Sequence, residues 1–292
     1  MNKVPAIDDA LLRAWPLPPV ENDGDKESRG RVLVVAGSRE MPGAAILAGT
    51  AALRAGAGKL VIATPQSAAQ AVALAMPEAR VIALPEASDG SPTASGLPLL
   101  QDIASSTAAL LVGPGMVGRE GTLAFVQPLL PLFTQATVLL DALAMDTVLS
   151  ARRFAQPVIL TPHAGEMAHL TGREKEDLQE EPVTVALRQA AAWNAVVALK
   201  GATTAIATPA GEAWTHQSEA PGLGTSGSGD VLAGVIAGLA ARGAAPEQAV
   251  AWGVALHARA GRALARKHGL VGYLARELPS EIPALMQALS ES

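Results

Sequence analysis

The residues with the clearest chemical potential lie in one glycine-rich stretch in the last third of the chain. It reads Gly-Leu-Gly-Thr-Ser-Gly-Ser-Gly-Asp over residues 222–230 and runs directly into an apolar segment at 231–239. Closely spaced glycines permit positive φ angles and let a ligand approach the main chain. A helix start offers unpaired N–H groups and the positive end of the helix dipole, which attract phosphate. Gly227, Ser228 and Gly229 are therefore candidate phosphate-binding residues.

Asp230 stands at the start of the helix that this pattern predicts. A carboxylate facing phosphate would be repelled, unless it held a metal ion or removed a proton from the group being phosphorylated. Acidic residues are also favoured in the first turn of a helix for reasons of stability alone. The stretch by itself leaves the catalytic and the structural interpretations of Asp230 open.

Five further positions each follow an apolar run that is typical of a buried strand. They are Gly37-Ser38, Gly113-Pro114-Gly115, Asp141, His163 and Lys200-Gly201. In open α/β sheets ligands bind beyond the carboxyl ends of the strands. Together with the glycine-rich stretch, these positions predict a binding pocket at one edge of a sheet.

Two of these positions allow more than one interpretation. The segment that begins at Lys200 and ends at Thr204 places a cation and a glycine where they could hold nucleotide phosphates, although a lone lysine at a turn is more often a surface residue. It is not a P-loop, because no Gly-Lys-Ser or Gly-Lys-Thr occurs, and Gly37 opens no dinucleotide-binding GxGxxG. Asp141 could hold Mg²⁺ through water, or it could simply cap a turn.

The histidines give a weaker signal. His163, Glu166 and His169 recur at three-residue steps, which drift around a helix and do not match a zinc-binding pair. His163 alone, at a strand end, is better placed to contact a ligand. His169, His257 and His268 are expected on helix surfaces.

The elements that must position these residues alternate between strand and helix patterns. We expect strands at 31–36, 59–63, 80–84, 108–112, 137–140, 158–160 and 194–199, a hairpin of 203–208 with 213–216, and helices at 44–55, 66–74, 122–130, 183–193, 246–268 and 282–289, besides the helix after Asp230. This alternation predicts an α/β fold, a three-layer α/β/α sandwich with a mostly parallel central sheet. Residues 1–30 are expected to form an N-terminal helix and a linking loop, and 31–292 a single domain. Gly234 and Gly238 share one helix face and predict a close helix contact.

Composition excludes several classes of protein. The 292 residues carry a formal net charge of −5 with no basic cluster, which argues against a nucleic-acid surface. The chain has no cysteine, so it has neither disulfides nor a thiolate nucleophile. The longest apolar run, 231–241, is too short to span a bilayer, and residues 1–10 lack the apolar core of a signal peptide. We expect a soluble cytoplasmic protein with no membrane or nucleic-acid partner.

The motifs together resemble the ADP-dependent NAD(P)H-hydrate dehydratases, which belong to the ribokinase-like superfamily. The resemblance covers about residues 30–290 and rests on Gly37-Ser38 with Met41-Pro42-Gly43-Ala44-Ala45, Gly113-Pro114-Gly115, Leu160-Thr161-Pro162-His163-Ala164-Gly165-Glu166, Lys200-Gly201-Ala202-Thr203-Thr204 and Gly227-Ser228-Gly229-Asp230. The last motif alone indicates only the superfamily, and the first and third give the finer assignment. Ser226 stands where the family often has glycine, a change that should leave the anion site in place.

The resemblance implies a repair reaction, in which ADP drives the dehydration of hydrated NADH or NADPH and yields NAD(P)H, AMP and phosphate. It implies Asp230 as the catalytic base, with Mg²⁺ as cofactor and ADP as co-substrate. The implied substrate-binding residues are Ala44, Ala45, Gly115, His163 and Asp230. The implied nucleotide-binding residues are Lys200, Gly201, Ala202, Thr203, Thr204, Gly227, Ser228 and Gly229. The resemblance also implies a homotetramer and cooperation with a separate NAD(P)H-hydrate epimerase.

Two alternatives remain from the sequence. A small-molecule kinase of the same superfamily, acting on an alcohol such as hydroxyethylthiazole or a pyridoxal-like compound, would use the same glycine turn and aspartate. A nucleotide sensor would bind ADP without catalysis, but it would gain little from an acidic side chain beside phosphate.

Overall fold

One nine-stranded sheet organises the part of the chain that the computed structural model describes, residues 4–20, 25–151 and 153–290. Its spatial order is β3-β2-β1-β4-β5-β6-β7-β8-β9. Neighbouring strands are parallel from β3 to β7, and the pairs β7–β8 and β8–β9 are antiparallel. The strands are β1 (Arg31–Val35), β2 (Lys59–Pro65), β3 (Ala79–Leu84), β4 (Ala109–Val112), β5 (Thr137–Leu140), β6 (Val158–Leu160), β7 (Val196–Leu199), β8 (Thr203–Ala207) and β9 (Ala213–Gln217).

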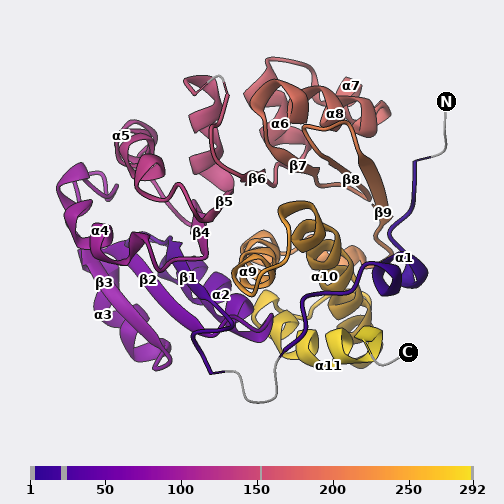
Figure 1. Ribbon diagram of the computed structural model, residues 1–292, viewed down its shortest axis with the longest axis horizontal. Coiled ribbons are helices and arrows are strands. Elements are labelled where there is room, and N and C mark those ends of the chain that lie inside the picture. The colour runs from indigo at the N-terminus through magenta and orange to yellow at the C-terminus, as the bar shows by residue number, and fades with distance from the viewer. Residues whose placement is uncertain (1–3, 21–24, 152, 291–292) are drawn as a thin grey trace.

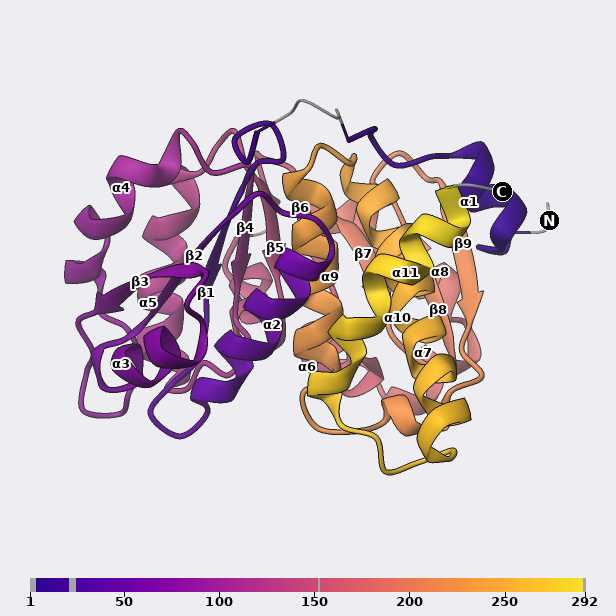
Figure 2. The same ribbon diagram turned by 90° about the horizontal axis from the view of Figure 1, so that it is seen from below.

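Helices cover both faces of this sheet and complete the three layers (Figures 1 and 2). Successive residues of a strand point to opposite faces, so Val32 and Val34 belong to one hydrophobic core while Leu33 and Val35 belong to the other. The first core also takes in α1 (Asp9–Ala14), α2 (Pro42–Arg54), α3 (Gln66–Ala75), α9 (Ser228–Ala241), α10 (Pro246–His268) and α11 (Leu278–Ser290). The second takes in α4 (Pro98–Ala104), α5 (Arg119–Leu129), α6 (Ala164–Thr171), α7 (Lys175–Glu180) and α8 (Pro182–Trp193).

The predicted α/β/α sandwich is confirmed, and each predicted strand is present with small shifts at its ends. The predicted hairpin is the antiparallel pair β8–β9. No helix was predicted at α4 or α7, which are short, and none at α6. Helix α5 begins at Arg119 rather than at residue 122, because Gly118 supplies the N-cap with a φ of 71°. Residues 21–24 of the expected linking loop lie outside the described residues.

The close helix contact predicted from two glycines is between α9 and α2. A Cβ on Gly234 would lie 2.2 Å from the carbonyl oxygen of Ala48, and one on Gly238 would lie 2.4 Å from that of Ala52. Only hydrogen fits at these two positions, so α9 can lie directly against the backbone of α2. This contact fixes the start of α9 relative to the sheet.

The N-terminal segment packs along the far edge of the molecule, over β9 and α10 (Figure 1). The Trp15 ring stacks on that of Trp214 with centroids 5.6 Å apart, and Trp252 Nε1 donates to the carbonyl oxygen of Trp15 at 2.9 Å. Within the described residues, no helix combines the length and the apolar character that a membrane span requires.

Candidate active site

The glycine-rich stretch forms the N-terminus of α9, as predicted, and its last four residues divide between cap and helix. Gly227 is the N-cap with a φ of 85°, and a Cβ there would lie 2.5 Å from the Leu47 side chain. Ser228, Gly229 and Asp230 form the first turn. The N–H of Ser228 already donates to the carbonyl oxygen of Thr225 at 3.2 Å. The N–H groups of Gly229 and Asp230 are therefore the better placed of this turn to receive an anion.

Asp230 has the electrostatic properties of a base that works near neutral pH. The pKa of its carboxyl group is raised to about 6, first by burial and then by the charge of Asp141, while Lys200 opposes the shift. Within the described chain its carboxylate has neither a hydrogen bond nor an ion pair with another side chain. It is therefore free to accept a proton from a ligand.

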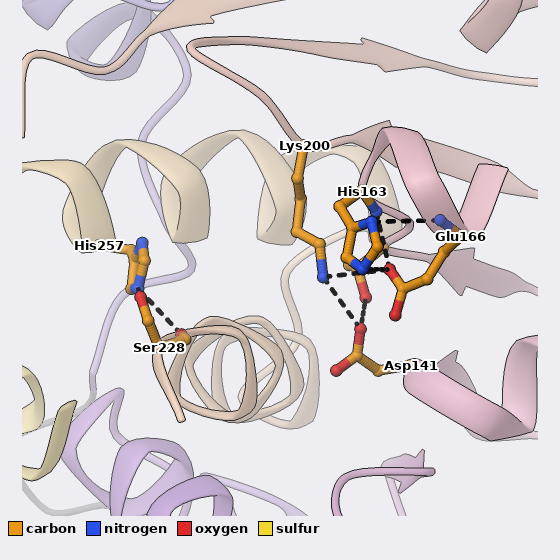
Figure 3. Close-up of polar contacts among 7 residues, drawn as sticks. Asp141, His163, Glu166, Lys200, Ser228 and His257 are labelled. Carbon is orange, nitrogen blue, oxygen red and sulfur yellow. Dashed lines mark hydrogen bonds and ion pairs between the residues drawn. The ribbon is translucent and has the colours of Figure 1, made fainter. Parts of the chain in front are cut away.

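Lys200 is held by carboxylates beside this helix start (Figure 3). Its Nζ lies 3.3 Å from Asp141 Oδ1 and 3.9 Å from Glu166 Oε2. Burial lowers the pKa of Lys200, but Asp141, Glu166 and Asp230 outweigh this effect and the pKa lies above its ordinary value. The side chain is thus a fixed positive charge at the end of β7.

Asp141, at the end of β5, is the buried partner of that lysine. Its Oδ1 also accepts a hydrogen bond from the Thr161 hydroxyl at 2.7 Å, and its side chain makes no cap bond to the helical turn that follows. The ion pair with Lys200 thus adds a role that the sequence did not suggest. No three His, Cys, Asp or Glu side chains among the described residues group as metal ligands. A Mg²⁺ ion here would depend mainly on nucleotide oxygens and water, as this cation commonly does.

His163 caps α6 through a reciprocal pair of hydrogen bonds with Glu166 (Figure 3). The N–H of Glu166 donates to His163 Nδ1 at 3.1 Å, and the N–H of His163 donates to Glu166 Oε2 at 2.8 Å. The exposed imidazole lines two cavities, one of about 720 Å³ and one of about 470 Å³. His169 turns instead to Asp146, at 3.2 Å.

The three small residues proposed for the substrate lie together beyond β1 and β4. Gly115 has a φ of 66°, and a Cβ on it would lie 2.5 Å from the Ala44 Cβ. Ala44 is nearly buried and Ala45 fully so, with Ala45 lying near Gly37. Ala45 could therefore contribute to the shape of a substrate site but not through an exposed surface.

Most of the predicted nucleotide-binding residues line the 720 Å³ cavity. It contains Lys200, Gly201, Ala202, Thr204, Ser228 and Gly229, whereas Thr203 and Gly227 are not part of its lining. The remaining walls are largely apolar and come from β9 and the residues that follow it, from 3-10 helix η4 (Pro221–Leu223), and from α9 and α10. A cavity with a cation and a helix N-terminus at one end and apolar walls elsewhere suits a nucleotide.

His257 in α10 is a residue for which the sequence-based prediction was wrong. It was expected on a helix surface, but it is buried and lines the same cavity. Its Nε2 lies 3.0 Å from both the hydroxyl and the carbonyl oxygen of Ser228 (Figure 3), and burial lowers its pKa to about 4. The apolar run Trp252 to Leu256 immediately before it was the signal that this face of α10 is buried. His268 is exposed, as expected.

Fold and site together define an α/β enzyme of the ribokinase-like class. A ribokinase-like superfamily protein from Enterococcus faecalis has a solved structure that superposes with a TM-score of 0.86 at 25% identity, covering 100% of this chain and 98% of that one. The profile of the NAD(P)H-hydrate dehydratase family matches residues 32–284, and the chain belongs to this family.

Two relatives support the same assignment. An ADP-dependent (S)-NAD(P)H-hydrate dehydratase of Xanthomonas campestris is 48% identical over 287 residues, 98% of each chain. The crystal structure of an ADP/ATP-dependent NAD(P)H-hydrate dehydratase from Bacillus subtilis, co-crystallized with ATP/Mg²⁺, has a TM-score of 0.83 at 32% identity. The match covers 99% of this chain and 100% of the Bacillus one. These names favour a dehydratase over the alternative of an alcohol kinase.

Proposed function

We propose that this protein uses ADP to dehydrate the hydrated form of NADH or NADPH and so restores the reduced cofactor, giving AMP and phosphate. The observation that supports this most directly is the carboxylate of Asp230 in the first turn of α9, which has no partner among the described side chains and a pKa raised to about 6. A base at that point can take the proton of a hydroxyl that approaches a phosphoryl group bound to the same helix start.

The reaction needs this arrangement because hydroxide is a poor leaving group. Asp230 would take the hydroxyl proton as the substrate oxygen forms a bond to the β-phosphorus of ADP and the bond from that phosphorus to the AMP oxygen breaks. The ring carbon would then lose phosphate, and its neighbour would lose a proton, so that the ring double bond forms again. Phosphoryl transfer depends largely on positioning and on charge stabilisation, which the turn and Lys200 would supply.

We assign the nucleotide and the hydrated cofactor to opposite sides of Asp230. The segment that runs from Lys200 to Thr204, with Ser228 and Gly229, would hold the nucleotide in the 720 Å³ cavity. Ala44, Gly115 and His163 would border the hydrated nicotinamide on the other side. Mg²⁺, when bound, would neutralise phosphate charge. Asp141 would help to hold it through water, using the carboxylate oxygen that neither Lys200 nor Thr161 engages.

The deciding experiment adds the purified protein, Mg²⁺ and ADP to NADH hydrate and follows the near-ultraviolet absorbance of dihydronicotinamide. We expect a rise that requires nucleotide and that yields AMP and phosphate in equal amounts. Chelation of divalent cations should stop the rise and added Mg²⁺ should restore it. A stable phosphorylated product with no rise, with ADP and ATP both tried, would instead indicate a kinase.

Several finer points belong to the same proposal and rest on the family resemblance. We propose a cytoplasmic homotetramer, which sedimentation velocity would test. We also propose that a separate epimerase interconverts the two hydrate epimers, so that both reach this enzyme. Full conversion of a mixed-epimer substrate by this protein alone would contradict the need for that partner.

A further inference from the structure

His216 is a second buried histidine of the nucleotide cavity, and the reaction as described above gives it no role. It lies on β9 directly opposite Thr204 of β8, and both residues line the cavity. Directly opposed residues of an antiparallel pair point to the same face of the sheet. The segment assigned to the nucleotide thus brings His216 into the same wall.

The imidazole of His216 is enclosed without a partner among the described residues. The residue is 7% exposed, and its Nδ1 is fully buried with no hydrogen bond. Across residues 4–20, 25–151 and 153–290, neither of its ring nitrogens is bonded to another group of the chain. Buried polar groups are normally hydrogen-bonded. Because Nδ1 is sealed within the protein and Nε2 is not among the fully buried atoms, Nε2 is the nitrogen through which this residue of the cavity wall can meet a ligand.

The charge state of His216 defines what kind of ligand group it can bind. Burial and the positive charges of Arg262 and Arg259 lower its pKa to about 4, so the ring is neutral at physiological pH. A neutral imidazole offers one donor and one acceptor and does not attract phosphate as a cation would. The edges of a purine base also present donors and acceptors side by side.

The position of His216 along the cavity favours the base over the phosphates. His257 contacts Ser228 in the first turn of α9 at 3.0 Å, whereas His216 lies on β9 opposite Thr204 of β8 and makes no hydrogen bond to that turn within the described residues. His216 therefore belongs to a wall of the cavity that is separate from the turn proposed to receive the phosphates. Apolar side chains of Leu223, Leu232, Val254 and Ala258 complete the cavity wall, which suits a flat ring.

We propose that His216 hydrogen-bonds to the purine ring of the nucleotide and sets the base preference of the enzyme. The inference rests on the proposed nucleotide-dependent function, because it assigns a base contact within that site. His216 is in this view a specificity residue, since it touches the co-substrate far from the transferred phosphoryl group.

The test measures nucleotide binding by calorimetry, so that it does not depend on turnover. His216→Phe keeps a flat aromatic ring, slightly larger than imidazole, and removes both nitrogens, and His216→Gln restores one donor and one acceptor. His268→Phe, at the exposed end of α10, is the matched control. ADP is compared with the diphosphate of purine riboside, which lacks the 6-amino group, with 1-, 3- and 7-deaza-ADP and with 2′-deoxy-ADP.

We expect His216→Phe to weaken ADP binding about 3- to 10-fold, as the loss of one neutral hydrogen bond predicts. His216→Gln should recover part of the loss, and His268→Phe should bind as the wild type does. At least one analogue with a modified base should bind the wild type more weakly than ADP does but bind His216→Phe as ADP does. The variant already lacks the contact that the modified base can no longer make.

Unchanged ADP affinity in His216→Phe would overturn the proposal. The proposal would also be overturned if 2′-deoxy-ADP were the only analogue that loses affinity for the wild type but not for His216→Phe, because this result would assign the contact to the ribose. If the phenylalanine variant fails to fold, His216→Ala removes the ring without steric strain and is read by the same comparison. Wild-type protein that binds ADP yet does not dehydrate NADH hydrate would contradict the proposed reaction while leaving this test intact.

Discussion

Asp230 lies at the positive end of α9, where the helix dipole favours a carboxylate, yet its pKa is raised rather than lowered. Burial and the neighbouring charge of Asp141 exceed the opposing effect of Lys200. The result is a carboxylate that is ionised at neutral pH and still basic enough to remove a hydroxyl proton.

Replacement of this base should separate chemistry from binding. We expect Asp230→Asn to lower the rate of dehydration by about 100- to 10,000-fold, the range typical for loss of a general base. The uncharged amide should leave ADP affinity equal or slightly higher, because a negative charge near phosphate is removed. The absorbance assay and calorimetry measure the two effects. A variant with a near-normal rate would contradict the assigned role.

The same group should control the pH dependence of the reaction. Since only the ionised form of Asp230 accepts a proton, kcat/KM should rise with pH up to about pH 6 and level off above it. Asp141 raises this pKa by like-charge repulsion. The acidic limb of Asp141→Asn should therefore shift to lower pH. An acidic limb at the same pH in both proteins would show that another group is titrating.

Asp230 should also reduce the stability of the fold at neutral pH. Below the unfolded pKa of 3.8 both states are protonated; as pH rises towards the folded value of about 6, the unfolded state loses its proton first and stability falls. This difference sets an upper limit of about 3 kcal/mol, which partial exposure reduces. Asp230→Asn should therefore be the more stable protein at pH 7 by urea unfolding, with a smaller gain at pH 4. A gain that is independent of pH would contradict this account.

The residues that the sequence proposes for this site lie within continuous motifs. The glycine turn and its acid carry their meaning in their own order along the chain, and Lys200 follows an apolar strand that ends at the same edge. The ion pair between Asp141 and Lys200 joins residues 59 positions apart, and the contact of His257 with Ser228 joins residues 29 apart. Such contacts depend on how helices pack on the sheet, which a local pattern does not contain.

At the scale of the helices, the contact between α9 and α2 positions the turn that carries Asp230. Gly234→Ala would ordinarily favour a helix, but its new Cβ would meet the Ala48 carbonyl oxygen at 2.2 Å. We expect overpacking to dominate and to lower the free energy of unfolding by about 1–3 kcal/mol. Denaturant unfolding measures this change.

Gly43→Ala is the matched control for that substitution. Gly43 is in the first turn of α2, and a Cβ there would meet no atom within 4 Å. Its replacement should leave stability unchanged or raise it by up to about 1 kcal/mol. A loss of stability at Gly43 equal to that at Gly234 would contradict the packing argument.

Helices were predictable where an apolar stripe had a clear beginning and end. The pair Gly234 and Gly238 even predicted a close contact, because two glycines on one helix face leave it open to a neighbouring backbone. Helix α6 was missed because its N-cap is His163, which closes a capping box with Glu166 in place of the usual serine, threonine or aspartate. Helix α7 is short and highly charged, and Leu178 is its one buried residue, so its sequence shows no clear apolar stripe.

At the scale of the molecule, the strands are added outward in chain order on both sides of the sheet. β1, β2 and β3 run outward in one direction, and β4 to β9 run outward in the other. The side on which strands are added therefore changes between β1 and β4, which are parallel neighbours. Gly37 and Gly115 follow the ends of these two strands. The alternation of strand and helix patterns predicted a parallel sheet but not this change of side. Neighbouring strands are joined by backbone hydrogen bonds, which do not depend on the side chains and so leave no signal in the sequence.

The N-terminal helix α1 is expected to stabilise the part of the fold near β9 and α10, although it is distant from both in the sequence. Leu12 of α1 is 0% exposed within the core formed with α9 and α10, the helices that line the nucleotide cavity. We expect Leu12→Ala to lower the free energy of unfolding by about 2–5 kcal/mol, through lost burial and the cavity left behind. Leu74→Ala, at a side chain 79% exposed on α3, should change it by less than about 0.5 kcal/mol. If both variants unfolded at the wild-type denaturant concentration, α1 would contribute nothing to this core. A loss of stability confined to Leu12→Ala would show that α1 is part of the core that supports these helices.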